Sequence, residues 1–126
     1  MIIDIIAGAR PNFMKIAPII EAIETAKSNG ENINYRLVHT GQHYDNKMSG
    51  DFFTQLGIPE PHLNLGAGGG SQAEQTAAIM IGYEKAIFDQ RPDLVLVVGD
   101  VTSTMACSVT AKKMNNITVA HVEGGI

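Results

Sequence analysis

The sequence has 126 residues, of which 44% are hydrophobic and 17% charged. This length is sufficient for one domain with one core, and the hydrophobic content predicts a folded chain. The net charge of -4 and the pI near 5.4 argue against nucleic acid or an anionic membrane as a partner, because both require clustered lysines and arginines. No apolar run approaches the roughly 18 residues that a transmembrane helix needs.

The compartment follows from the first residues and from cysteine usage. Residues 1–6 are too few for a signal peptide, contain Asp4 and have no basic leader. Cys107 is the single cysteine, so no internal disulfide can form. Together these features predict a cytoplasmic protein. Small apolar residues surround Cys107, which favours a packed thiol over a nucleophile.

The chain opens with a strand pattern and a helix pattern. Residues 2–7 form a nearly continuous apolar run that ends at Gly8, which is typical of a strand buried on both faces. The following helix has one apolar face, made by Ile16, Ile19, Ile20 and Ile23. Pro18 predicts a break or kink near Ala17, and residues 28–30 close the helix.

The middle of the chain predicts short elements. Residues 35–39 form the second strand, and a short helix is expected over 46–56, ending at Gly57. Residues 62–65 form a short third strand.

The last part returns to longer elements. Ser71 and Glu74 form a capping box that begins a helix reaching about Gln90. Five consecutive β-formers at 94–98 predict a central parallel strand.

A further helix, capped by Thr102 or Ser103, is expected to reach Met114 before a final strand at 117–122. Strands separated by helices predict an α/β fold, with a parallel sheet and right-handed crossovers.

Charged and polar residues gather where the predicted strands end. Parallel strands place these ends at one edge of the sheet, hereafter the rim, which is where open α/β sheets bind ligands. The opposite ends of the strands show little comparable chemistry. The rim candidates are Gly8, Arg10, Lys15, Gln42, His43, Asp100, His121 and Glu123.

Two cations beside the first helix predict an anion site. Gly8 lets a ligand approach the backbone, and a helix N-terminus offers free N–H groups. Arg10 and Lys15 at this position suit a diphosphate, although a solvated helix lysine would give the same pattern for Lys15 alone.

Two carboxylates follow the last two strands. Asp100 could serve acid/base chemistry, bind a metal or cap the next helix, whereas capping explains Glu123 less easily. Paired carboxylates whose pKa values are pushed apart suit paired proton transfers. His43 could protonate a leaving group, contact phosphate or be an ordinary turn histidine.

The histidines do not predict a metal site. No pair among the four has the H-x-x-x-H spacing of a helical metal site. No dinucleotide or Walker fingerprint follows the first strand, so no nucleotide cofactor is expected.

Four motifs together resemble the non-hydrolysing UDP-N-acetylglucosamine 2-epimerases. Residues 8–15 with Ala17 and Pro18 resemble their G-T-R-P-E-x-x-K-x-x-P opening. Residues 40–43 match T-G-Q-H, and residues 92–102 resemble P-D-x-V-x-V-x-G-D-T. The last motif, at 121–126, is similar to the start of H-V-E-A-G-L-R.

The resemblance implies the N-terminal, Rossmann-like three-layer domain of a GT-B-like two-domain enzyme. Its partners would be UDP-N-acetylglucosamine and UDP-N-acetylmannosamine, interconverted at C2 through elimination and re-addition of UDP without a cofactor. It implies that Asp100 and Glu123 are catalytic, and that Gly8, Arg10, Lys15 and His43 bind substrate.

The resemblance also implies features of the whole enzyme. Gln42 and His43 fall in the loop that is linked, in bacterial members, to an activating second substrate molecule. A cytoplasmic homodimer that serves cell-surface polysaccharide synthesis is expected. Because the uridine-binding domain would follow residue 126, residues 1–126 are predicted to be a truncated domain that is inactive alone.

Three other functions remain open from sequence. An inverting glycosyltransferase has the same fold and binds its nucleotide mainly through the second domain. A hydrolysing epimerase needs only that water captures the glycal. A flavodoxin-like anion-binding or regulatory module is a non-enzymatic alternative, although Arg10 replaces the acidic pocket of a receiver domain.

Overall fold

The computed structural model describes residues 1–8, 10–40, 50–59, 61–65, 70–98, 102–114 and 117–122. Strands and helices alternate along most of the chain. The elements in chain order are β1 (Ile2–Ala7), α1 (Arg10–Ser28), β2 (Asn34–His39), α2 (Gly50–Leu56), β3 (Leu63–Asn64), α3 (Gln72–Asp89), β4 (Leu94–Val98), α4 (Thr102–Lys113) and β5 (Thr118–Val122).

The five described strands form one sheet in the order β3-β2-β1-β4-β5. Every described pairing is parallel, which confirms the predicted α/β fold. β1 occupies the centre, whereas β4, predicted to be central, is one place from it. Both strands are internal, which explains why β4 is a continuous apolar run and β1 is apolar except for Asp4.

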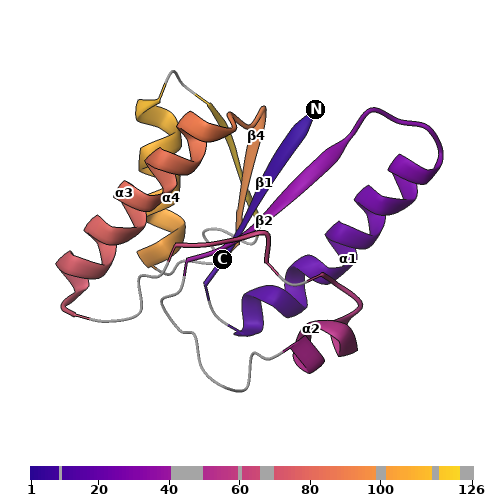
Figure 1. The fold of residues 1–126 in the computed structure, drawn as a ribbon, viewed down its shortest axis with the longest axis horizontal. Coiled ribbons are helices and arrows are strands. Elements are labelled where there is room, and N and C mark those ends of the chain that lie inside the picture. Colours follow the sequence, from indigo (N-terminus) through magenta and orange to yellow (C-terminus); the bar gives the residue numbers. More distant parts are fainter. Residues whose placement is uncertain are drawn as a thin grey trace.

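Helices cover both faces of the sheet and give three layers (Figure 1). The core on one face joins α1 and α2 to the sheet, with Phe13, Ile16 and Phe53 among its buried side chains. The core on the other face joins α3 and α4 to the sheet, through residues such as Ile79 and Ala111. No helix in the described ranges is long and apolar enough to cross a membrane.

Helix α1 runs unbroken through Pro18, so the expected break near Ala17 is wrong. Pro18 is exposed, while Ile16 and Ile20 on the opposite side are fully buried. Packing of that apolar side holds the helix across the one lost backbone hydrogen bond. The predicted end is confirmed: Gly30 has a φ of 89° and its N–H donates to the Lys27 carbonyl at 3.1 Å.

The shorter elements agree with prediction where they are described. α2 ends at Leu56, before Gly57, while residues 46–49 of the predicted helix lie outside the described residues. β3 covers only Leu63–Asn64. α4 begins at Thr102, and the predicted cap at Thr102 or Ser103 stays a prediction, because those side chains lie outside the described residues.

The predicted capping box at the start of α3 is present. The Glu74 N–H donates to Ser71 Oγ at 3.2 Å, and the Ser71 N–H donates to Glu74 Oε1 at 3.1 Å. Two N–H groups that the helix cannot satisfy internally are thereby bonded.

Ser71→Ala is expected to lower the free energy of unfolding by about 1 kcal/mol, because it removes one of these acceptors. Urea denaturation of the chain measures the change. Ser71→Asp restores an acceptor and should retain the parent stability. Equal stability of the alanine variant and the parent would contradict a stabilising role for the cap.

Cys107 lies on α4 and is fully buried in the core between this helix and the sheet, which confirms the packed thiol. Burial, with a smaller contribution from the charge of Asp4, raises the pKa of the thiol well above its usual range. The folded chain therefore disfavours the thiolate.

This raised pKa predicts an alkaline loss of stability. An unfolded thiol ionises near about pH 8.5, so the stabilisation is complete below that pH and is lost as the pH rises toward the folded pKa. The free energy of unfolding should fall by about 1.4 kcal/mol per pH unit between roughly pH 8.5 and 10. Cys107→Ala should remove the thiol's share of this slope and leave the smaller share of Tyr83, whose pKa is also raised; an unchanged slope in urea titrations would contradict the assignment.

Candidate functional site

The backbone brings the ends of the strands to one rim. Ala7 pairs with His39, and Val98 pairs with Val122, so β1 with β2 and β4 with β5 end level with one another. Ile6 pairs with Val97, which joins the two pairs across the centre of the sheet.

The predicted catalytic carboxylates follow these strand ends directly. Asp100 comes two residues after Val98, and Glu123 comes one residue after Val122. Both carboxylates, with Gln42 and His43, lie outside the described residues. The register therefore supports a shared rim, and the catalytic assignment stays a prediction.

The anion site is described in part. Gly8 is buried directly after β1, and its N–H donates to Asn12 Oδ1 at 3.4 Å. Asn12 itself is buried in the first turn of α1, so it closes the strand-to-helix turn. Arg10 begins α1, and its side chain lies outside the described residues; Lys15 is exposed in the same helix. Gly8 and both cations are thus at the end of α1 that offers N–H groups to an anion.

Aromatic rings form a floor below this part of the rim. The Phe13 ring lies 5.2 Å from the His39 ring and 5.3 Å from the Phe53 ring, the second contact being edge-on. All three side chains are buried. This packing fixes the start of α1 against the end of β2. His39 therefore has a structural role as part of the buried aromatic cluster.

The described histidines, His39, His62 and His121, do not form a cluster that could hold a metal ion. His62 Nδ1 accepts a hydrogen bond from the Leu37 N–H at 2.9 Å, beside β3. His121 is exposed on β5, which forms the opposite edge of the sheet from β3. Within the described ranges no three His, Cys, Asp or Glu side chains are placed to hold a metal ion.

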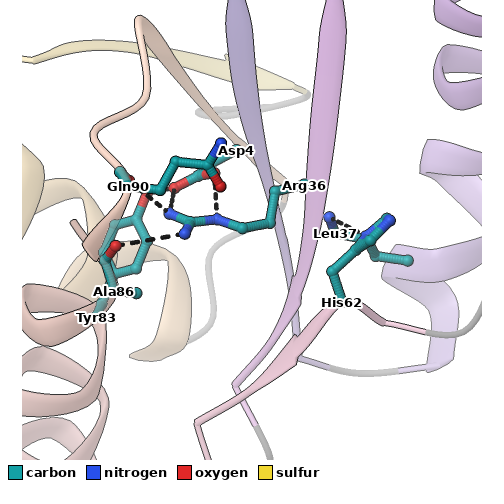
Figure 2. Close-up of polar contacts among 7 residues, drawn as sticks. All are labelled: Asp4, Arg36, Leu37, His62, Tyr83, Ala86 and Gln90. Carbon is teal, nitrogen blue, oxygen red and sulfur yellow. Dashed lines mark hydrogen bonds and ion pairs between the residues drawn. The ribbon is translucent and has the colours of Figure 1, made fainter. Parts of the chain in front are cut away.

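A buried polar network lies away from the rim, toward the amino ends of the strands (Figure 2). Arg36 Nε and Nη2 donate to the two carboxylate oxygens of Asp4 at 2.8 and 2.7 Å. The Tyr83 hydroxyl donates to Asp4 Oδ2 at 2.7 Å. Arg36 also donates to the carbonyls of Ala86 and Gln90, at 3.3 and 3.1 Å. These contacts are structural, so the expectation that the opposite ends carry little functional chemistry stays a prediction.

The network ties α3 to the sheet. Asp4 is fully buried in the central strand, and the Arg36 side chain is 11% exposed. Burial, followed by the charge of Asp4, raises the pKa of Tyr83 far above its usual range. Burial lowers the pKa of Arg36, and the hydrogen bonds and charge of Asp4 outweigh this, so that its pKa rises. Asp4 interrupting an apolar strand was the sequence signal for this network.

The fold defines a Rossmann-like three-layer α/β domain, a class in which ligands generally bind at the carboxyl ends of the parallel strands. The model of the UDP-N-acetylglucosamine 2-epimerase family matches residues 25–126. The chain therefore belongs to the UDP-N-acetylglucosamine 2-epimerase family.

Similar curated proteins include enzymes with two different substrates in their names. A UDP-N-acetylglucosamine 2-epimerase from Methanocaldococcus jannaschii is 40% identical over 126 residues, which are all of this chain and 33% of the relative. A UDP-2,3-diacetamido-2,3-dideoxy-D-glucuronate 2-epimerase from Pseudomonas aeruginosa is 40% identical over 121 residues, or 96% of this chain and 33% of the relative. The chain spans about a third of the length of these relatives.

Solved structures share the fold. The Methanocaldococcus jannaschii UDP-GlcNAc 2-epimerase in complex with UDP-GlcNAc and UDP has a TM-score of 0.88 and 41% identity, covering 99% of this chain and 33% of the neighbour. The Neisseria meningitidis UDP-GlcNAc 2-epimerase bound to UDP-GlcNAc has a TM-score of 0.84 and 29% identity. The match covers 100% of this chain and 33% of the neighbour.

Proposed function

We propose that this chain is the N-terminal domain of a cytoplasmic enzyme that interconverts UDP-N-acetylglucosamine and UDP-N-acetylmannosamine. Membership of the epimerase family over residues 25–126 is the observation that carries the proposal. The relative with this name is 40% identical along all of the chain. The level ends of β4 and β5 support it, since the carboxylates predicted to be catalytic follow these two strand ends in the sequence.

The reaction assigns a role to each carboxylate. One of Asp100 and Glu123 accepts the proton from C2 of the sugar, the C1–O bond to UDP breaks, and a C1–C2 double bond forms. UDP then adds back to C1, and a carboxylic acid returns a proton to C2 from the opposite face. Atoms balance without a redox cofactor, because the substrate and the product are isomers.

The cations serve the leaving group. Departure of UDP develops negative charge on the diphosphate, and fixed positive groups stabilise that charge more in the transition state than in the substrate. We assign this stabilisation to the positive charges of Arg10 and Lys15, which belong to the first turns of α1. Gly8 leaves room for the ligand at the backbone, His43 contacts substrate, and Gln42 with His43 belongs to the activator site.

The remaining proposals concern the whole enzyme. The uridine is bound by a second domain of a GT-B-like fold, so residues 1–126 alone are expected to be inactive. The product serves cell-surface polysaccharide synthesis. These statements follow from the family and from the chain covering a third of its relatives.

The enzyme is proposed to be a homodimer that associates through the outer surface of α3 and α4. Ile81 and Phe88 on α3 are 58% and 77% exposed, and Val109 on α4 is 38% exposed. A groove between the helices carries Glu84 on α3 and Lys113 on α4. A second copy placing its α3 against this α4 would bury the apolar side chains and pair the opposite charges.

Light scattering tests the dimer on the chain itself. The parent should have the mass of two chains, and Phe88→Asp should have the mass of one. Met14→Asp alters an exposed apolar residue on the other face and should remain dimeric. A monomeric parent at high concentration would exclude this surface as a self-association site.

A second substrate is supported by a specific observation. The Pseudomonas aeruginosa relative, named for a diacetamido-glucuronate sugar, matches this chain at the same 40% identity. Both UDP-sugars should therefore be supplied to the product of the complete reading frame, with the products separated by anion-exchange chromatography.

The outcomes separate the alternatives. Conversion of UDP-N-acetylglucosamine to a UDP-linked epimer supports the main proposal, and conversion of the glucuronate alone supports the second. Free N-acetylmannosamine with UDP would identify a hydrolysing epimerase. Transfer of the sugar to an acceptor without epimer would identify a glycosyltransferase and contradict both proposals.

A further inference from the structure

Thr40 is a buried polar residue whose hydroxyl has no partner. Its side chain is fully buried, and Oγ1 makes no hydrogen bond to any described residue. Other buried polar groups are satisfied: Asp4 accepts from Tyr83, and the Thr110 hydroxyl donates to the Ala106 carbonyl at 2.8 Å. An unsatisfied buried hydroxyl costs folding free energy and requires an explanation.

The backbone of Thr40 is held firmly at the rim. Thr40 directly follows β2, and its N–H donates to the Ala7 carbonyl at 3.1 Å, continuing the ladder with β1. On the other side of β2, the Leu65 N–H donates to the His39 carbonyl at 2.8 Å. The missing hydrogen bond therefore does not arise from a loosely placed backbone.

The direction of the side chain follows from strand alternation. Val38 packs in the core of the α3–α4 face, whereas the His39 ring lies against Phe13 on the α1 face. The next side chain, Thr40, therefore points to the α3–α4 face, level with Gly8. Since α4 follows the parallel strand β4, its N-terminus lies at this same rim.

We propose that Thr40 is a positioning residue whose hydroxyl makes its hydrogen bond only in the substrate-bound enzyme. The partner is a rim group that the nucleotide sugar brings into place, and the bond fixes that group in its catalytic arrangement against the firmly held end of β2. Complete burial makes this role more suitable than direct contact with the sugar. The inference rests on the proposed epimerase function and adds a residue to its site.

Valine at position 40 separates this role from a packing role. Valine has the shape of threonine without the hydroxyl, so Thr40→Val removes the unsatisfied group and keeps the contacts. The melting temperature of the ligand-free enzyme should stay the same or rise. The KM for UDP-N-acetylglucosamine should rise about tenfold, the equivalent of one hydrogen bond.

The experiment uses the product of the complete reading frame. Steady-state kinetics and the rise in melting temperature caused by UDP-N-acetylglucosamine are measured for the parent, Thr40→Val and Thr40→Ser. The increase in melting temperature caused by UDP-N-acetylglucosamine should be smaller in Thr40→Val than in the parent. Thr40→Ser should have the parent's increase in melting temperature and the parent's KM. Thr110→Val, which removes a satisfied buried hydroxyl, should change the melting temperature and leave KM unchanged.

Two failures are distinguishable. A valine variant with the parent KM and the parent rise in melting temperature would overturn the role of Thr40 alone. A parent enzyme that neither binds nor converts UDP-N-acetylglucosamine would overturn the proposed function, and the role of Thr40 with it.

Discussion

Asp100→Asn and Glu123→Gln are each expected to lower the kcat of the complete enzyme by about 10²–10⁴-fold, the range that proton transfer by a positioned side chain supplies. Each amide has nearly the shape of its carboxylate and cannot accept or return the C2 proton. Initial rates with UDP-N-acetylglucosamine at saturation measure the change.

The control separates chemistry from folding. Both variants should keep the melting temperature of the parent, and Glu21→Gln, which changes an exposed carboxylate on α1, should keep the parent kcat. If either rim variant retained the full kcat, that carboxylate would have no part in the proton transfers, and its assignment to the site would be wrong.

Arg36→Met is expected to lower the free energy of unfolding of the chain by about 3–5 kcal/mol. The substitution leaves the carboxylate of Asp4 fully buried with the Tyr83 hydroxyl, and it removes the two donors that neutralise it. It also removes the donors to the Ala86 and Gln90 carbonyls at the end of α3. Chemical denaturation of residues 1–126 measures the loss.

A double variant provides the matched comparison. Asp4→Leu combined with Arg36→Met replaces both charges by apolar groups and should recover a large part of the lost stability. Lys85→Met, an exposed basic residue on α3, should remain within about 0.5 kcal/mol of the parent. A single Arg36 variant as stable as the parent would show that the buried pair contributes nothing.

Periodicity predicted the fold well because most elements here bury a regular face. The run at 94–98 is apolar throughout and the run at 2–7 is apolar except for Asp4, since both strands are covered on both sides. Pro18 misled the prediction because its local penalty was weighed without the packing of Ile16 and Ile20 against the sheet. Local propensity yields to tertiary contacts at such positions.

Only the edge of the sheet at which the site is expected could be predicted from the sequence. Parallel strands oblige their carboxyl ends to share an edge, and the register confirms that β1, β2, β4 and β5 end there, whereas the roles of Asp100 and Glu123 stay predictions. The Asp4–Arg36–Tyr83 network was not predicted, because the partners are 32 and 79 positions from Asp4 and only the register of β1 with β2 and the packing of α3 bring them together. Thr40 was read as part of a motif, and its lack of a partner is a property of the packed fold alone.

The most direct test of the proposed function is proton NMR of UDP-N-acetylglucosamine in deuterium oxide, with the product of the complete reading frame and residues 1–126 in parallel samples. The proposed mechanism predicts that deuterium replaces the C2 proton and that a UDP-N-acetylmannosamine signal appears, in the complete enzyme only. Exchange by residues 1–126 alone would contradict the need for a second domain. An intact C2 proton in the complete enzyme would contradict the epimerase function and favour a glycosyltransferase.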